Sequence, residues 1–293
     1  MATHTQLTTQ WHDWIVENLA RGCAVQALVE DMCRSGFDAT FAHAAVEALA
    51  RGEQPPAVAP LKAQATAYVA DAPRLPAGNV IPTHDRDVRV LLRVAAPTIA
   101  VLDQVLSDEE CDELIRRSAN TLQRSTTVDP VNGGYEVIAA RSSEGTFFPV
   151  NADDFIAQLD RRIAELMNCP VENGEGLQVL HYGEGGEYQP HFDYFSPGDP
   201  GSEAQMVVGG QRVSTLLIYL NDVAQGGATV FPTLGLRVLP KKGMAVYFEY
   251  SNRDGQVDPL TLHGGEPVEK GEKWIITKWM RQRRYGLAAP AEL

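Results

Sequence analysis

Two potential metal ligands stand two residues apart in the segment "PHFDYF", residues 190–195, where His191 and Asp193 interrupt an aromatic run. If the segment is a β-strand, side chains two apart point to the same face, so the imidazole and the carboxylate converge. His263, in "LTLHGGEPV", is a third candidate. Two histidines and one carboxylate on one face of a metal leave coordination positions open, which is the ligand set of non-haem Fe(II) oxygenases. An H-x-D pattern also occurs by chance, and a lone histidine such as His263 is more often a turn or core residue.

A lysine at the start of an apolar strand favours the catalytic interpretation. As a regular strand, the segment "KWIITKWMR" places five residues on one face: Lys273, Ile275, Thr277, Trp279 and Arg281. A lysine on such a face requires an anionic partner. We therefore expect a dicarboxylate cosubstrate, with one end on the metal and the far carboxylate on Lys273.

Four segments then resemble the prolyl 4-hydroxylase family of Fe(II)- and 2-oxoglutarate-dependent dioxygenases. They are "LQVLHYGEGGEYQPHFDYF", "GGQRVSTLLIYLNDVAQGGATVFP", "KKGMAVYFEY" and "DPLTLHGGEPVEKGEKWIITKWMRQ". The similarity covers residues 95–285 and is strongest over 177–281. The fold that this resemblance implies is a double-stranded β-helix, or jelly roll.

The resemblance also implies a role for each motif residue. His191, Asp193 and His263 would be the iron ligands, and Lys273, at the family spacing after His263, would hold the distal carboxylate of 2-oxoglutarate. Tyr182 would hydrogen-bond the cosubstrate. Three further positions would border the substrate pocket: Tyr188, Arg212 and Trp279. The implied reaction is the 4-hydroxylation of a prolyl residue in a peptide or protein, with release of succinate and CO₂. It would use Fe(II), 2-oxoglutarate and O₂, with ascorbate as a reductant.

Two features depart from the family pattern. Animal and algal members carry a histidine at the position of Arg281, so we expect Arg281 at the substrate end, at the pocket mouth or as a surface charge. The segment between Asp193 and Arg212, "YFSPGDPGSEAQMVVGGQ", is polar and glycine-rich, which is typical of a mobile substrate loop and equally of a passive surface loop. A dry pocket wall is expected from four apolar residues: Leu180, Phe192, Leu216 and Ile218.

Two other functions remain open from the sequence. One is a hydroxylase of the same fold that acts on a free amino acid or another small molecule such as a natural product. The other is a non-catalytic binding module, against which the complete ligand set and Lys273 both argue. Because a fold does not specify a substrate, the sequence leaves the substrate unidentified.

The elements that would position these residues fall into two groups. Three amphipathic helices are expected within residues 10–50, with Asp38 as an N-cap. Later helices are expected after a capping box of Ser107 with Glu110 and after Asn151 as a cap. Short β-branched and aromatic segments between Gly, Pro and Asp turns make up the rest, which predicts a mainly β domain with flanking helices. We expect a small helical region over 1–54, a linker over 55–85 and a dioxygenase domain over 86–293.

Composition limits the partners and the compartment. The chain has 293 residues, 44% of them hydrophobic, and a net charge of −13, which argues against nucleic acid as a partner. No apolar stretch is long enough for a membrane span, so no membrane partner is expected. Four scattered cysteines and the lack of a secretory signal at the N-terminus predict reduced thiols in the cytoplasm. The oligomeric state is not encoded in any feature that we recognise.

Overall fold

The structure is a computed structural model that describes residues 7, 9–35, 37–53, 68–129, 133–138 and 140–285. The chain divides into two units, residues 1–67 and 68–293. The first unit holds the three expected helices, α1 (Thr9–Ala20), α2 (Val25–Arg34) and α3 (Ala39–Ala50), and the Asp38 side chain caps α3 by accepting from the Phe41 amide. Among the described residues, no helix is both long and apolar enough to cross a membrane.

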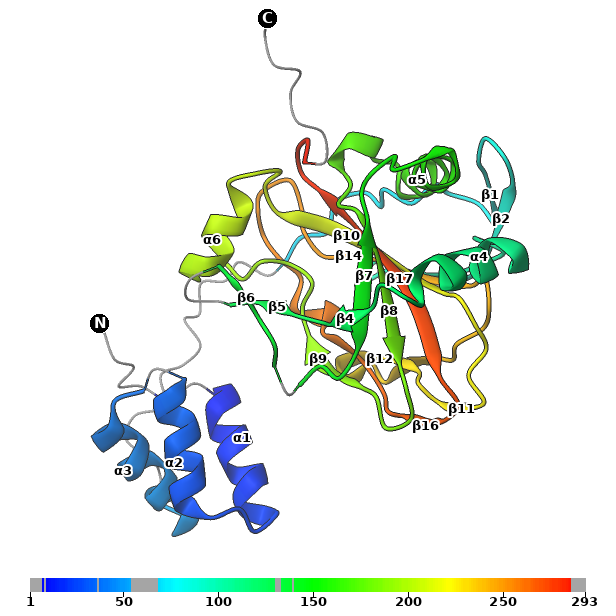
Figure 1. Cartoon of the computed structure of the whole chain (residues 1–293). Coiled ribbons are helices and arrows are strands. Elements are labelled where there is room, and N and C mark those ends of the chain that lie inside the picture. The colour runs from blue at the N-terminus through cyan, green and yellow to red at the C-terminus, as the bar shows by residue number, and fades with distance from the viewer. Residues whose placement is uncertain are drawn as a thin grey trace, which may run out of the picture. The chain divides into compact units, whose positions relative to one another are not determined.

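The second unit is built on two antiparallel sheets (Figure 1). The larger sheet has nine strands in this order: β1 (Val80–Pro82), β2 (Asp87–Val94), β3 (Ile99–Asp103), β14 (Ala245–Glu249), β10 (Arg212–Tyr219), β17 (Lys273–Arg281), β8 (Leu177–Tyr182), β7 (Glu144–Phe148) and β4 (Gln123–Arg124). The smaller sheet has four: β13 (Leu236–Val238), β12 (Thr229–Phe231), β15 (His263–Gly265) and β9 (Tyr188–His191). Two short pairs complete the strands: β11 (Gln225–Gly226) with β16 (Val268–Lys270), and β5 (Thr127–Val128) with β6 (Tyr135–Glu136). The expected double-stranded β-helix is confirmed.

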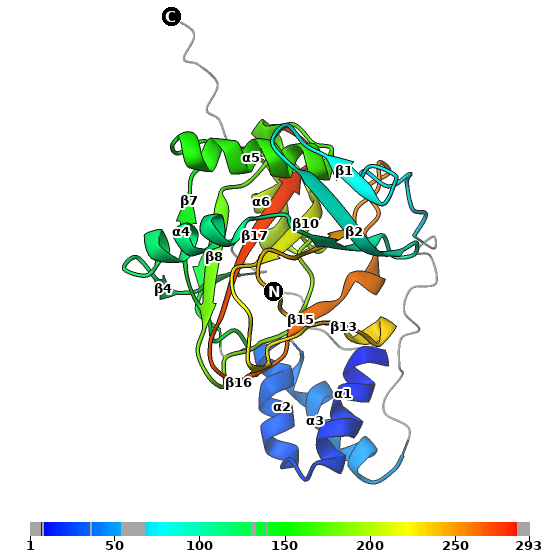
Figure 2. The same ribbon diagram turned by 90° about the vertical axis from the view of Figure 1, so that its right-hand side faces the viewer.

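The two faces of the large sheet have different partners because side chains alternate along each strand. One face packs against α4 (Asp108–Ser118) and α5 (Asp154–Met167), which lie outside the sheet in both views (Figures 1 and 2). The other face packs against the small sheet through residues such as Leu180, Leu217 and Phe231. Leu216 and Ile218 belong to the helix-facing core, so the prediction that they line the pocket wall is wrong. Their neighbours along β10 face the pocket side instead.

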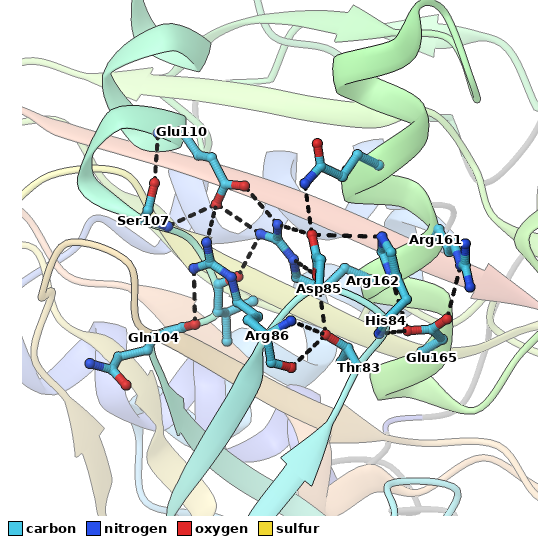
Figure 3. Close-up of polar contacts among 12 residues, drawn as sticks. Thr83, His84, Asp85, Arg86, Gln104, Ser107, Glu110, Arg161, Arg162 and Glu165 are labelled. Carbon is cyan, nitrogen blue, oxygen red and sulfur yellow. Dashed lines mark hydrogen bonds and ion pairs between the residues drawn. The ribbon is translucent and has the colours of Figure 1, made fainter.

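A buried ion network fastens the two outer helices (Figure 3). The Arg162 guanidinium of α5 pairs with Asp85 in the β1–β2 turn and with Glu110 of α4. Glu110 also completes the expected capping box with Ser107. The cap of α5 is Asp153, whose side chain accepts from the Ile156 amide, and not Asn151 as the sequence suggested.

The segment expected to be a linker over 55–85 is shorter than predicted. Residues 54–67 lie outside the described residues, but 68–85 are part of the second unit, whose boundary is therefore at Tyr68. Leu75 and Ile81 are buried in the helix-facing core, and β1 pairs with β2. Arg74 adds an ion pair to the buried carboxylate of Glu249, at 3.2 Å. The Pro- and Ala-rich composition of this segment suggested a linker. Its order comes from these contacts with distant strands.

Two truncated chains test this boundary. A chain that begins at Tyr68 should fold and melt as the second unit does in the full chain. A chain that begins at residue 86 loses Leu75 and Ile81, each worth about 1.5–3 kcal/mol of burial, and strips Glu249 of its cation. It should be insoluble or melt at a much lower temperature in thermal denaturation. Equal melting temperatures for the two chains would show that residues 68–85 add no stability to the second unit and act as a linker.

Candidate active site

Three potential ligands meet between the two sheets. β15 pairs with β9 so that His263 lies opposite His191 in the register. Asp193 follows two residues after β9 ends, in a turn, yet its carboxylate still points to the same place as the imidazole. The His191 Nε2 lies 3.7 Å from Asp193 Oδ1, and the His263 Nε2 lies 3.5 Å from Asp193 Oδ2. One potential ligand atom from each of the three lies within 4.8 Å of the others, so a single ion fits among them.

Hydrogen bonds orient both imidazoles for metal binding. The Nδ1 of His191 lies 2.9 Å from the Gln189 carbonyl, and the Nδ1 of His263 lies 2.9 Å from the Thr261 carbonyl. A carbonyl only accepts, so each Nδ1 carries the proton and each Nε2 presents a lone pair toward the other ligands. Burial, with His263 close by, lowers the pKa of His191 to about 3, which keeps that ring neutral. Neutral imidazoles and a carboxylate are donors suited to Fe(II).

Lys273 lies on the same side of the large sheet, in the same pocket. It is 3% exposed, and no hydrogen bond or ion pair to it occurs among the described residues. Burial lowers its pKa to about 8, against the opposing effect of Glu266. A buried cation without an anionic partner is costly, so an anion is the expected occupant beside it. Tyr182 stands opposite Lys273 in the β8–β17 register and lines the pocket too.

The pocket around these groups has a volume of about 860 Å³. Tyr188, Arg212 and Trp279 all line it. The Tyr188 ring stacks on His191, with centroids 3.6 Å apart, and Arg212 lies over Trp279 at 3.9 Å. The expected wall residues Leu180 and Phe192 line the pocket, whereas Leu217 and Thr215 take the places expected of Leu216 and Ile218.

Arg281 is not where the sequence suggested. It is 1% exposed, it does not line the pocket, and it is therefore neither a pocket-mouth residue nor a surface charge. Its guanidinium donates to three carbonyls, of Gln205, Val208 and Gly210. These carbonyls belong to the last turn of α6 (Pro200–Met206) and the chain just after it. Cations favour helix C-termini, so Arg281 holds the end of α6, a helix that the sequence did not predict within the glycine-rich loop.

Replacement of Arg281 by alanine should loosen this pocket wall. Hydrogen bonds from a charged group contribute about 1.5–3 kcal/mol each, so amide exchange over residues 200–211 should rise at least tenfold. Arg283→Ala is the matched control, because that exposed side chain makes a single 3.5 Å contact with the Met206 carbonyl. Exchange measured by mass spectrometry that is the same in both variants would contradict the role of Arg281.

Several buried polar residues of the pocket were not predicted from the sequence, among them Glu175, Arg141 and Thr229. Glu175 binds Arg212 through both carboxylate oxygens, at 2.7 and 2.9 Å. Arg141 is 5% exposed, and its hydrogen-bond partners within the described part of the chain are neutral, among them Gln178 and the Thr126 carbonyl. Thr229 shares a 2.7 Å hydrogen bond with the Tyr219 hydroxyl, which also lies 3.2 Å from the Val238 carbonyl. No local spacing marks these residues, since each is brought to the pocket by strand pairing alone.

Comparison with known proteins agrees with this geometry. Residues 177–281 match the family model described as the 2OG-Fe(II) oxygenase superfamily, a range that contains the two histidines, the aspartate and Lys273. With its jelly-roll fold, the chain is a 2-oxoglutarate-dependent dioxygenase that uses Fe(II), 2-oxoglutarate and O₂.

Relatives narrow the class further. The chain is 40% identical over 208 residues to prolyl 4-hydroxylase 5 of Arabidopsis thaliana, covering 64% of this chain and 70% of that protein. It is 37% identical over 252 residues to prolyl 4-hydroxylase 1 of the same plant, covering 78% and 84%. A solved structure of a viral collagen prolyl hydroxylase from Paramecium Bursaria Chlorella virus-1, in a 2OG complex, aligns with a TM-score of 0.49 at 30% identity, covering 62% and 95%. The chain belongs to the prolyl 4-hydroxylase family.

Proposed function

We propose that the enzyme hydroxylates C4 of a prolyl residue within a peptide or protein. The observation that carries this proposal is the size and extent of the pocket. At about 860 Å³ it is near the upper end of ligand-site volumes, and its lining runs from Thr121 to the metal ligands and on to Tyr285. A cosubstrate and a free amino acid would fill only part of this volume, whereas it can also hold several residues of a peptide chain.

In this proposal each residue of the site has a defined task. His191, Asp193 and His263 bind Fe(II). Lys273 binds the distal carboxylate of 2-oxoglutarate, and the hydroxyl of Tyr182 hydrogen-bonds the cosubstrate. When bound, Fe(II) supplies the centre at which 2-oxoglutarate and O₂ are converted to succinate and CO₂ and a C–H bond becomes C–OH.

The remaining pocket residues bind substrate and exclude water. Leu180, Leu217 and Ile275 form an apolar wall beside the ligands, which limits side reactions with water. Among the described residues the indole N–H of Trp279 has no hydrogen-bond partner, so it can donate to a substrate carbonyl after a small shift. The ring of Phe192, 36% exposed beside the ligands, offers an apolar surface to a pyrrolidine ring. Tyr188 and Arg212 shape the same region, and Arg281 acts on substrate binding through α6 and through its 3.2 Å ion pair with Glu175, the carboxylate that binds Arg212.

Mass spectrometry on a panel of substrates tests this function. Proline-containing peptides should gain one oxygen in the presence of Fe(II), 2-oxoglutarate and O₂, while free proline and other free amino acids should not. Oxygen gain on a free amino acid alone would favour the small-molecule hydroxylase. Absence of both oxygen gain and succinate release would favour the binding module.

Two finer points belong to the same proposal. Ascorbate serves as the reductant that restores Fe(II), and its omission should shorten the burst of turnover. A cytoplasmic location is supported by the cysteines, since Cys23, Cys33, Cys111 and Cys169 are all free thiols.

A further inference from the structure

A chain of two hydroxyls stands behind the candidate ligand Asp193. Thr215 of β10 places its Oγ1 2.7 Å from Asp193 Oδ2. The hydroxyl of Tyr250, in the residue after β14, lies 3.0 Å from the same Oγ1. The side chains are almost fully removed from solvent, with exposed fractions of 8% for Asp193, 1% for Thr215 and 0% for Tyr250.

The direction of both hydrogen bonds follows from the donor inventory. An ionised carboxylate only accepts, so Thr215 donates its single hydroxyl proton to Asp193. The Thr215 oxygen is then an acceptor for Tyr250, which must donate. Burial first, and the negative charge of Asp193 second, raise the pKa of Tyr250 well above its ordinary value, so its proton is retained throughout the working pH range.

This arrangement holds the carboxylate at Oδ2, the oxygen that also lies 3.5 Å from His263 Nε2. Arg212 adds a contact to the backbone, since its guanidinium lies 3.3 Å from the Asp193 carbonyl. The bond to Thr215 is the one hydrogen bond of the Tyr250 hydroxyl among the described residues, so the tyrosine has no competing task there. Outer hydrogen bonds of this kind orient metal ligands and raise metal affinity.

We propose that Tyr250 and Thr215 form a hydroxyl relay that orients Asp193 and sets the metal affinity of the site. Tyr250 is a positioning residue that acts through Thr215. The inference rests on the proposed role of Asp193 as a ligand, and it goes beyond that role by assigning a part of the affinity to two residues that never touch the metal.

The relay predicts a specific pattern of metal affinities. Thr215→Val removes the donor to Asp193 and should weaken metal binding about 10- to 100-fold. Tyr250→Phe should weaken it by a smaller factor, because Thr215 keeps its proton but loses the partner that orients it. In Thr215→Val/Tyr250→Phe the factor should equal that of Thr215→Val alone, since residues in one network are not additive. Thr215→Ser keeps the hydroxyl and should restore wild-type affinity.

Titration of the full chain with Co(II), followed by visible absorption, measures these dissociation constants without turnover. Tyr247→Phe is the matched control, because Tyr247 is equally buried on β14 but bonds to Glu249 in the opposite core. It should bind Co(II) like the wild type. Thermal unfolding without metal checks that each variant folds, and a variant that does not fold is replaced by another that lacks the hydroxyl, Thr215→Ala or Tyr250→Leu.

Three results would overturn the relay: a wild-type affinity in Tyr250→Phe, multiplied losses in the double variant, or the same loss in Tyr247→Phe. Asp193→Ala separates the relay from the proposed function. If Asp193→Ala binds Co(II) like the wild type, the ligand assignment itself fails. If Asp193→Ala loses binding while Tyr250→Phe does not, only the relay fails.

Discussion

Alanine at any one of His191, Asp193 or His263 should abolish turnover and leave the fold intact. Each residue would supply one of only three protein ligands, and the loss of one leaves a site that holds the metal weakly and in the wrong geometry. The two sheets do not depend on these side chains, because the helix-facing core and most of the second core lie elsewhere.

His181→Ala is the control for this first prediction. His181 lies on β8, packs against the Trp274 ring at a tilt and pairs with Glu272, outside the pocket. Turnover should persist in His181→Ala, with succinate release and Co(II) binding both close to wild type. A ligand variant that keeps near wild-type turnover at limiting iron would remove that residue from the site.

Lys273→Ala should give the second large effect, a strong rise in the KM for 2-oxoglutarate with every prime substrate alike. A buried ion pair that loses one partner costs about 3–5 kcal/mol, which corresponds to a rise in KM between about 10²-fold and several times 10³-fold. Arg281→Ala should leave this KM and the uncoupled decarboxylation of 2-oxoglutarate unchanged, and weaken only substrate hydroxylation. An unchanged KM for 2-oxoglutarate in Lys273→Ala would refute the cosubstrate assignment.

The pH dependence of the same KM gives an independent readout. Burial lowers the pKa of Lys273 to about 8 in the free enzyme, so the ammonium form binds the carboxylate below pH 8. Above pH 8 a proton must be taken up for binding, and the KM should rise about tenfold per pH unit. In Lys273→Arg this rise should disappear, because a guanidinium remains charged.

Features with a local signal were predictable from the sequence. The H-x-D spacing, the strand alternation from Lys273 to Trp279 and the capping box of Ser107 with Glu110 each depend on neighbours in the chain. The structure brings the first two to one pocket and confirms the third. Side-chain direction on a strand is set by parity, so Lys273, Ile275, Thr277 and Trp279 all line the pocket, whereas Arg281 at the end of β17 does not.

Features fixed by distant contacts were not predictable. Leu216 was placed one position out of phase, because β10 is apolar on both faces and its own sequence carries no alternation. α6 was missed because its residues are polar and its C-terminal carbonyls are satisfied by Arg281, 71 to 76 residues away. The end of the linker was misplaced for the same reason, since the amides of Arg74 and Leu75 donate to the Glu249 carboxylate at the end of β14.

The two buried lysines of β17 bear on how this enzyme could be re-engineered. Lys273 faces the pocket, whereas Lys278, five residues on and therefore on the opposite face, is fully buried against Asp160 at 2.6 Å. A slip of the strand by one residue would send Lys278 into the pocket and leave Asp160 buried without its cation, so this pair fixes the strand in one register. Libraries that seek new substrates should vary Thr277 and Trp279 and keep Lys278 constant. Substitutions at Thr277 and Trp279 alter which substrates the enzyme binds. A substitution at Lys278 alters whether β17 pairs in its native register.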